Sequence, residues 1–185
     1  MRILAISGSL RAGSYNTSLL RAAAQLAPAD VEVELYDGLE ALPPYNEDRD
    51  TDHPPDEVVE LRALVSEADG LLLSTPEFNG TIPGQLKNLV DWASRPRGRG
   101  AALFGKPAAV IGASPSEYGA MWAQDHLRNA LRIAGARVVE AEVPGGRITD
   151  RIGPDGELSD AGMLESLAEI VGSLSAHHAA LAQAA

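Results

Sequence analysis

Short apolar runs alternate with longer amphipathic segments along this chain of 185 residues. Residues 2–6, 70–74 and 107–111 are almost continuously apolar, which is typical of strands buried on both faces of a parallel sheet. Residues 31–36 alternate between polar and apolar side chains instead, so they predict a strand with one wetter face near the edge of the sheet. A fifth strand is expected at 137–142.

Helical patterns fill the intervals between these strands. Apolar residues recur at helical spacing in segments 16–28, 56–68, 82–96, 119–133 and 160–178. Residues 37–55, rich in Pro, Asp and Asn, show no periodicity and predict an irregular surface loop. Five strands alternating with five helices predict an α/β fold, a doubly wound parallel sheet in a three-layer sandwich, with a ligand crevice beyond the carboxyl ends of the strands. The loops after the first, third and fourth strands should therefore meet at one site.

The length and composition fit one domain. With 45% hydrophobic and 22% charged residues, the chain has enough apolar side chains for one sizeable core. We expect this domain to span residues 1–178 and the Ala-rich segment 179–185 to be a disordered or fraying tail. No run approaches the roughly 18 apolar residues of a membrane span, and the start runs into a turn rather than a signal-peptide core, so a cytoplasmic location is expected.

Charge and cysteine content narrow the possible partners. The formal net charge is -11, from 26 acidic and 15 basic residues, so the surface should repel nucleic acid and anionic lipid. We therefore expect neither nucleic acid nor membrane as a partner. The chain has no cysteine, which excludes disulfides, thiolate metal ligands and a cysteine nucleophile. Any redox chemistry must then reside on a bound cofactor.

The segment 7–17 joins the first strand to the first helix and carries the chemistry of a phosphate site. Hydroxyls, backbone N–H groups and the guanidinium of Arg11 lie where the helix dipole favours an anion. The spacing matches neither a Walker loop nor the G-x-G-x-x-G of dinucleotide folds, and it suits a terminal phosphate monoester. The alternative is an ordinary polar turn in which Asn16 caps the helix.

The segment 74–84 follows the third strand and is a stiff loop. It contains two prolines, two glycines, an aromatic residue and an amide in eleven residues. Such a loop can present backbone donors to a planar heterocycle such as a flavin, which needs no catalytic side chain to receive a hydride. Taken alone, Phe78 is better explained as a hydrophobe that covers the end of the sheet.

Two motifs in these loops resemble a known family. They are Gly-Ser-Leu-Arg-x-Gly-Ser-x-Asn at 8–16 and Pro-Glu-Phe-Asn-Gly-Thr-Ile-Pro-Gly-x-Leu-Lys-Asn-x-x-Asp-Trp-Ala-Ser at 76–94. Both are similar to the signature segments of the NADPH-dependent FMN reductase family, which includes quinone, chromate and azo-dye reductases. The order of strands and helices also matches, from Met1 to about His178.

The resemblance implies a flavodoxin-like fold with strand order 2-1-3-4-5 and FMN bound non-covalently. NADPH or NADH would deliver hydride to flavin N5 and leave, and a small acceptor such as a quinone, azo compound or metal oxyanion would then take its place in a ping-pong cycle. It also implies a homodimer or homotetramer. The segment matching 9–17 wraps the FMN phosphate in this family, and the segment matching 76–79 lies against the isoalloxazine ring, usually with Tyr where this chain has Phe78.

A third loop, at 112–124, both matches and departs from the family. Ser114, Pro115, Gly119 and Gln124 fit its pattern, whereas Ser116 replaces a usual Gly and Trp122 a usual Arg. Trp122 could stack on a nicotinamide or quinone, or fill a core or a subunit interface.

The predicted FMN contacts come from all three loops, and no catalytic side chain or metal ligand is predicted. His126 lacks metal-ligand neighbours at zinc spacing, and Lys87 and Asp91 are expected to form an ion pair along one helix. A flavodoxin-type electron carrier, or a flavin-binding module without turnover, remains the alternative function. The predicted cofactor contacts are Ser9, Arg11, Ser14, Tyr15, Asn16, Thr17, Pro76, Glu77, Phe78, Asn79, Gly80, Ser114 and Tyr118.

Overall fold

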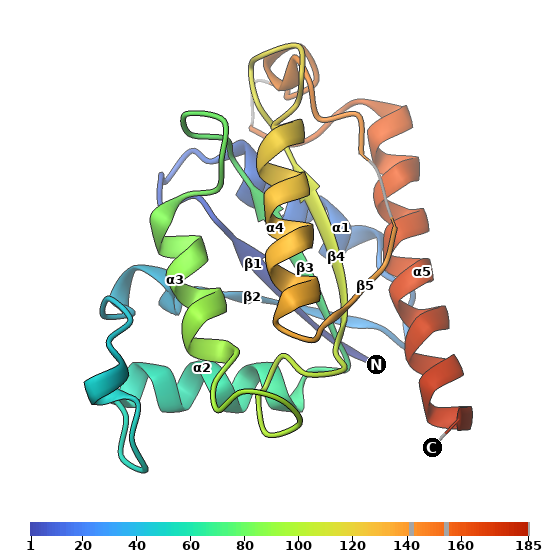
Figure 1. Cartoon of the computed structure of the whole chain (residues 1–185). Helices are drawn as coiled ribbons and strands as arrows, with labels where there is room; N and C mark the ends of the chain where they lie inside the picture. The colour runs from blue at the N-terminus through green and yellow to red at the C-terminus, as the bar shows by residue number, and fades with distance from the viewer. Residues whose placement is uncertain (141–142, 154–155, 185) are drawn as a thin grey trace.

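A five-stranded parallel sheet in the order β2-β1-β3-β4-β5 forms the centre of the molecule, as predicted (Figure 1). The computed structural model describes residues 1–140, 143–153 and 156–184. The order reverses direction between β1 and β3, so this is the flavodoxin-like topology, with its ligand crevice at the carboxyl ends of these two strands. The strands are β1 (Arg2–Ser7), β2 (Glu32–Tyr36), β3 (Gly70–Thr75), β4 (Pro107–Gly112) and β5 (Arg137–Val138).

Helices cover both faces of the sheet. α1 and α5 pack on one face, and α2, α3 and α4 pack on the other (Figure 1). Successive residues of β3 therefore enter different cores: Leu71 and Leu73 pack with α2, α3 and α4, and Leu72 packs with α1 and α5. This two-sided burial explains why the strand is continuously apolar. The helices are α1 (Tyr15–Leu26), α2 (Asp56–Glu67), α3 (Gly84–Ala93), α4 (Met121–Ile133) and α5 (Ala161–Ala184).

The last strand and the last helix differ in length from the sequence prediction. β5 pairs with β4 only through Arg137 and Val138, and one further bond runs from Val139 N–H to the carbonyl of Ala108 (2.8 Å). Residues 141–142 of the predicted strand lie outside the described residues. From residue 143 the chain bonds to the loop after β4 instead of to the strand itself, so the edge strand ends early. α5 begins as predicted and continues to Ala184, while the fraying of 179–185 stays a prediction.

The loop 37–55 is more ordered than its composition predicts. It contains two short 3-10 helices, η1 (Gly38–Ala41) and η2 (Glu47–Arg49), and buries Leu39 and Leu42 in the core beside α3. The apolar residues within this Pro-rich segment were the signal that part of it is core rather than surface loop.

One face of α3 fixes this loop by side-chain hydrogen bonds. Asn88 accepts the N–H of Tyr45 (2.7 Å) and donates to the carbonyl of Pro43 (2.8 Å). The Nε1–H of Trp92 donates to the same carbonyl (2.8 Å), and Tyr45 packs edge-on against the Trp92 ring. Gln85 donates to two further carbonyls of the loop. These three residues recur at i, i+3 and i+7, so the amides and indole of the second motif hold a loop in place.

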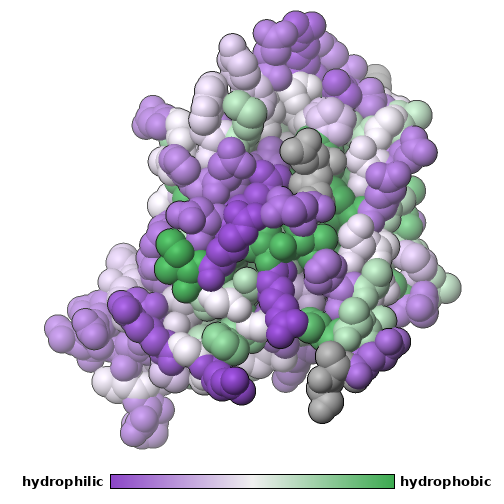
Figure 2. Space-filling view, turned by 45° about the vertical axis from the view of Figure 1, so that its right-hand side comes forward, coloured by the Kyte–Doolittle hydropathy of each residue, from purple (hydrophilic) through white to green (hydrophobic). Residues whose placement is uncertain are grey.

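Hydrophilic residues dominate the face that Figure 2 shows, both at the top of the molecule and at its lower left, and the hydrophobic residues form small patches near the middle of the view. Among the residues that the structure describes, no helix has both the length and the hydropathy needed to cross a membrane.

We predict that Trp92→Phe lowers the free energy of unfolding by about 1–3 kcal/mol, because it keeps an aromatic ring but leaves the half-buried carbonyl of Pro43 with one donor fewer. Urea denaturation of the purified protein measures this change. Trp122→Phe is the matched control, since Trp122 is 46% exposed, and it should change stability by less than about 0.5 kcal/mol. Equal effects of the two substitutions would show that the indole bond does not hold the loop.

Candidate functional site

The side chain of Asn16 ties together the carboxyl ends of three strands. Its Oδ1 accepts the hydroxyl of Ser74 (2.8 Å) at the end of β3 and the N–H of Ala113 (3.0 Å) just after β4. Its Nδ2 donates back to the carbonyl of Ala113 (3.2 Å). Asn16 and Ser74 are both buried. The loops after β1, β3 and β4 therefore meet at one place, as predicted, and the Oδ1 of Asn16 and one of its Nδ2–H groups are engaged within the protein.

Ser14, rather than Asn16, caps α1. Its Oγ accepts the N–H of Thr17 (3.3 Å), and the Thr17 hydroxyl donates to Ser7 Oγ (2.9 Å). The interpretation of Asn16 as an ordinary N-cap is therefore wrong. The first N–H groups of a helix have no partner within the helix, and they carry the positive end of its dipole. Arg11 is exposed above this turn, with its guanidinium 5.0 Å from the centre of the Tyr15 ring.

Gly8 brings the first loop into direct contact with the second. Its N–H donates to the carbonyl of Ser74 (2.8 Å). A Cβ at this position would lie 2.7 Å from Leu86 Cδ2 and 3.3 Å from Pro76 Cδ, closer than ordinary packing permits. A glycine suits this position because the first loop packs closely against Pro76 and the Leu86 side chain of α3, not because the turn needs an unusual backbone conformation.

The second loop is built on a tight two-residue turn. Phe78 and Thr81 exchange both backbone hydrogen bonds (2.9 and 3.1 Å), and the two residues between them, Asn79 and Gly80, have φ of 52° and 75°. Two successive positive φ angles define the turn that the sequence Asn-Gly favours. Phe78 is 56% exposed at the turn, so it does not cover the end of the sheet. Its ring faces solvent beside the site.

Two side-chain bonds join this loop to α4. Glu77 Oε2 accepts the N–H of Ala123 (3.2 Å) in the first turn of the helix, and Thr81 Oγ1 lies 2.9 Å from His126 Nδ1. An acceptor is favourable at the positive end of a helix. Glu77 was predicted as an FMN contact, and the structure gives its carboxylate a positioning role between the second and third loops.

The third loop turns sharply into α4. Gly119 and Ala120 both have positive φ (60° and 61°), and Ser114 Oγ accepts the N–H of Ser116 (3.1 Å). Tyr118 is 59% exposed, and its ring centre lies 5.1 Å from that of Trp122. Since Trp122 is about half exposed, it does not fill the core. Tyr118 lines a cavity beside the third loop, and the Trp122 ring packs against it.

A segment that the sequence pattern did not single out, residues 143–151, packs backbone to backbone against the third loop. Ser114 N–H donates to the carbonyl of Gly145 (3.1 Å), and Arg147 N–H donates to that of Ser116 (2.9 Å). A Cβ on Gly145 would overlap the carbonyl oxygen of Gly112, and one on Gly146 would overlap that of Glu117. The signal for this approach was the Gly-Gly pair after the last strand.

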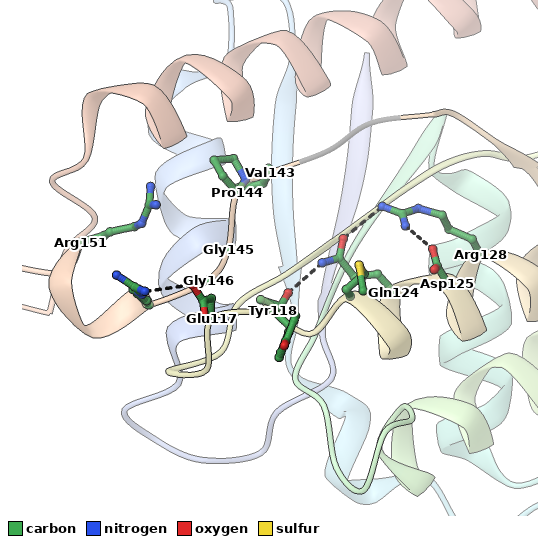
Figure 3. Close-up of a pocket in the computed structure, with 13 residues that line it drawn as sticks. Glu117, Tyr118, Gln124, Asp125, Arg128, Val143, Pro144, Gly145, Gly146 and Arg151 are labelled. Carbon is green, nitrogen blue, oxygen red and sulfur yellow. Dashed lines mark hydrogen bonds and ion pairs between the residues drawn. The ribbon is translucent and has the colours of Figure 1, made fainter.

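A cavity of about 580 Å³ lies between the third loop and this segment (Figure 3). Gln124 points into the loop and donates to the carbonyl of Gly119 (2.9 Å). Arg128 and Asp125 form an ion pair (3.0 Å) at one end of the cavity, and Arg151 lies at the other end (Figure 3). The cavity also opens beside Tyr118.

A second cavity, of about 430 Å³, lies beside the first loop. Ser9 and Thr17 line one side of it, and Tyr36, Asp37 and Glu40 line another. Burial, followed by the charges of nearby carboxylates, raises the pKa of Tyr36 to about 12, so its hydroxyl stays protonated at neutral pH. The two carboxylates oppose a phosphate in this cavity, which leaves the first turn of α1 as the better anion site.

The remaining candidates have structural roles. Lys87 and Asp91 form the predicted ion pair on α3 (2.7 Å). His126 is exposed and bonds to Thr81. Within the described parts of the chain, no group of three or more His, Cys, Asp or Glu residues is placed to hold a metal ion.

We predict that Asn16→Ala lowers the free energy of unfolding by about 2–4 kcal/mol, because it leaves the buried Ser74 hydroxyl and the Ala113 N–H without their acceptor. Gln25→Ala, at an exposed position of α1, is the control and should change stability by less than about 0.5 kcal/mol. Urea denaturation of the FMN-free proteins measures both. If the urea denaturation curves of the two variants have the same midpoint and slope, the bridging role of Asn16 is contradicted.

Comparison with known proteins identifies the family. The family model described as NADPH-dependent FMN reductase matches residues 1–150. The chain is 45% identical to an NAD(P)H-dependent FMN reductase of Pseudomonas aeruginosa over 131 residues, 71% of this chain and 69% of that protein. It is 35% identical to a quinone reductase of Escherichia coli over 170 residues, 90% of this chain and 89% of that protein.

A solved structure agrees with this match. FerB, a flavoenzyme NAD(P)H:(acceptor) oxidoreductase from Paracoccus denitrificans, superimposes with a TM-score of 0.82 at 34% identity and covers 96% of each chain. The chain thus belongs to the NADPH-dependent FMN reductase family, and it is an NAD(P)H-dependent oxidoreductase that uses FMN.

Proposed function

We propose that FMN binds across the three loops that Asn16 joins, with its phosphate at the start of α1. The observation that carries this placement is the triple hydrogen bonding of the Asn16 side chain, which holds the loops together through contacts within the chain itself. The first loop offers what a phosphate dianion needs: helix N-terminal N–H groups, the hydroxyls of Ser9, Ser14 and Thr17, and the exposed guanidinium of Arg11.

The flat ring of FMN fits against the second and third loops. The turn at 78–81 and the start of α4 are held rigidly to one another through Glu77 and Thr81. Pro76, Phe78, Asn79 and Gly80 would then form one wall of the ring site, and Ser114 and Tyr118 would border its edge. Tyr15 supports the first loop through its contact with Arg11.

The chain positions the redox partners and excludes water, while bound FMN supplies the electron-transfer chemistry between NAD(P)H and the acceptor. The acceptor we propose is a quinone. Two relatives are named 2-hydroxy-1,4-benzoquinone reductase and quinone reductase, and the exposed rings of Phe78, Tyr118 and Trp122 offer flat apolar surface to such a molecule. Donor and acceptor would use the same opening in turn, as a ping-pong cycle requires.

The protein is further proposed to act in the cytoplasm as a homodimer or homotetramer. A groove of about 660 Å³ runs between α3 and α4, and it is lined by Val90, Ala130 and Ile133 among others. Ile133, the last residue of α4, borders this groove and is 81% exposed, and exposed apolar surface of this kind marks contact sites.

Ile133→Glu should therefore shift the protein toward monomers, because it places a charge in an apolar contact. Size-exclusion chromatography with light scattering measures the mass. Val59→Glu, at an exposed valine of α2, is the control and should leave the mass unchanged. An unchanged mass for Ile133→Glu would place the subunit contact elsewhere.

Arg11→Ala should weaken FMN binding by about tenfold, since it removes the one cation of the first loop and a hydrogen bond to a charged group is worth roughly that much. Fluorescence titration of the FMN-free protein with FMN measures the affinity. Arg99→Ala, an exposed arginine after α3, is the control. Equal affinity of the Arg11 variant and the wild type would refute this role.

Steady oxidation of NADPH by the purified protein with a quinone tests the reaction itself. Sustained turnover supports the reductase, and a single reduction of bound FMN without turnover would favour an electron carrier instead.

A further inference from the structure

The cavity in Figure 3 continues from the proposed flavin site along the surface of the molecule. Tyr118 lines this cavity and also borders the proposed ring site, so the two spaces adjoin. The volume of about 580 Å³ falls in the range of small-molecule sites, about 300–1,000 Å³. When the nicotinamide of NADPH lies over the flavin, the adenosine part of the same molecule must extend away from the flavin. This cavity has the space to receive it.

Two arginines lie together at one end of the cavity, each paired with a carboxylate, although the chain as a whole carries -11. Arg147 and Arg151 flank the short helix η3 (Ile148–Asp150), and both line the cavity. Arg128 lies at the opposite end and already bonds to Asp125, Gln124 and the carbonyl of Val110. The first two arginines are therefore the ones placed to meet an anion.

The partner of Arg147 can be replaced by a ligand. Arg147 and Glu117 form an ion pair (2.9 Å) in which the two side chains are 64% and 70% exposed. Exposed pairs of this kind contribute little to stability, so a phosphate can displace the carboxylate at small cost. Arg151 is held by Asp160 (3.3 Å) and is more buried, which keeps its guanidinium oriented while Arg147 moves.

We propose that this cavity binds the adenosine end of NADPH, with Arg147 and Arg151 holding its 2′-phosphate. The assignment rests on the proposed function, in which the nicotinamide end lies at the flavin. Guanidinium groups match the oxygens of a phosphate monoester in charge and in geometry. The close packing of Gly145 and Gly146 against the third loop fixes the segment that carries Arg147. NADH lacks this phosphate, so the two arginines would select between the two donors.

The direct test is calorimetric titration of the FMN-loaded protein with 2′,5′-ADP and with 5′-AMP, which differ only in the 2′-phosphate. The wild type should bind 2′,5′-ADP more tightly than 5′-AMP. Arg147→Gln should lower the affinity for 2′,5′-ADP by about tenfold, because it removes a charge-assisted hydrogen bond, and should leave that for 5′-AMP nearly unchanged.

A second variant should change the affinity for 2′,5′-ADP in the opposite direction. Glu117→Gln removes the carboxylate that competes for Arg147, so it should raise the affinity for 2′,5′-ADP, by about threefold given the weakness of exposed ion pairs. Arg137→Gln is the matched control: it changes the net charge by the same amount as Arg147→Gln, at an exposed position where β5 begins, at the other end of the sheet. It should behave as the wild type.

Kinetics then separate this inference from the proposed function. Arg147→Gln should raise KM for NADPH by about tenfold with little change in KM for NADH. Equal affinity of the wild type for 2′,5′-ADP and 5′-AMP, or identical behaviour of the Arg147 and Arg137 variants, would overturn the proposal. FMN binding and NADH oxidation test the proposed function independently. If both persist while the 2′-phosphate has no effect, only the proposed 2′-phosphate site is refuted.

Discussion

The site depends on one buried amide. Parallel strands end at the same edge of a sheet, but their ends are not otherwise bonded to one another once the strand ladder stops. Asn16 supplies that connection, because its Oδ1 and Nδ2 pair with Ala113 much as a strand residue would, and Oδ1 also receives the Ser74 hydroxyl. A buried polar group is costly unless its bonds are made, so the three loops are held in one relative arrangement. Holding the loops in one arrangement reduces the ordering that binding of a ligand would otherwise require.

Other contacts hold the remaining loops of the site in place around Asn16. Gly8 lets the first loop touch the second, Glu77 connects the second to α4, and Gly145 lets the segment after β5 close on the third. Behind them, α3 uses Asn88 and Trp92 to fix the loop 37–55. Much of the second motif therefore serves the support of the site rather than contact with a ligand. Such bracing suits a flavoenzyme, since the cofactor performs the electron transfer and the chain must keep its partners aligned.

The sequence revealed the sheet better than it revealed the contacts between loops. Uninterrupted apolar runs required burial on both sides, and the parallel topology with its switch point followed. The bridging role of Asn16 was not predicted, because an Asn near a helix start has the same local pattern whether it caps that helix or reaches another strand; its partner lies 97 positions away. For the same reason the segment 143–151 was not singled out. Periodicity describes a residue's own element, and the approach of residues 143–151 to the third loop is a property of the tertiary fold.

The packing of residues 143–151 against the third loop bears on the positions at which that loop departs from the family pattern. The resemblance leads one to expect Arg at position 122, and this chain has Trp122 there, an aromatic ring packed against Tyr118. The exchange removes a cation from the border of the site and adds flat apolar surface. Arg147, whose N–H bonds to Ser116 of the same loop, supplies a cation from a neighbouring segment, where it pairs with Glu117. The third loop and this segment thus present aromatic surface together with an exposed arginine, which suits a donor that is flat at one end and anionic at the other, followed by an acceptor that is flat alone.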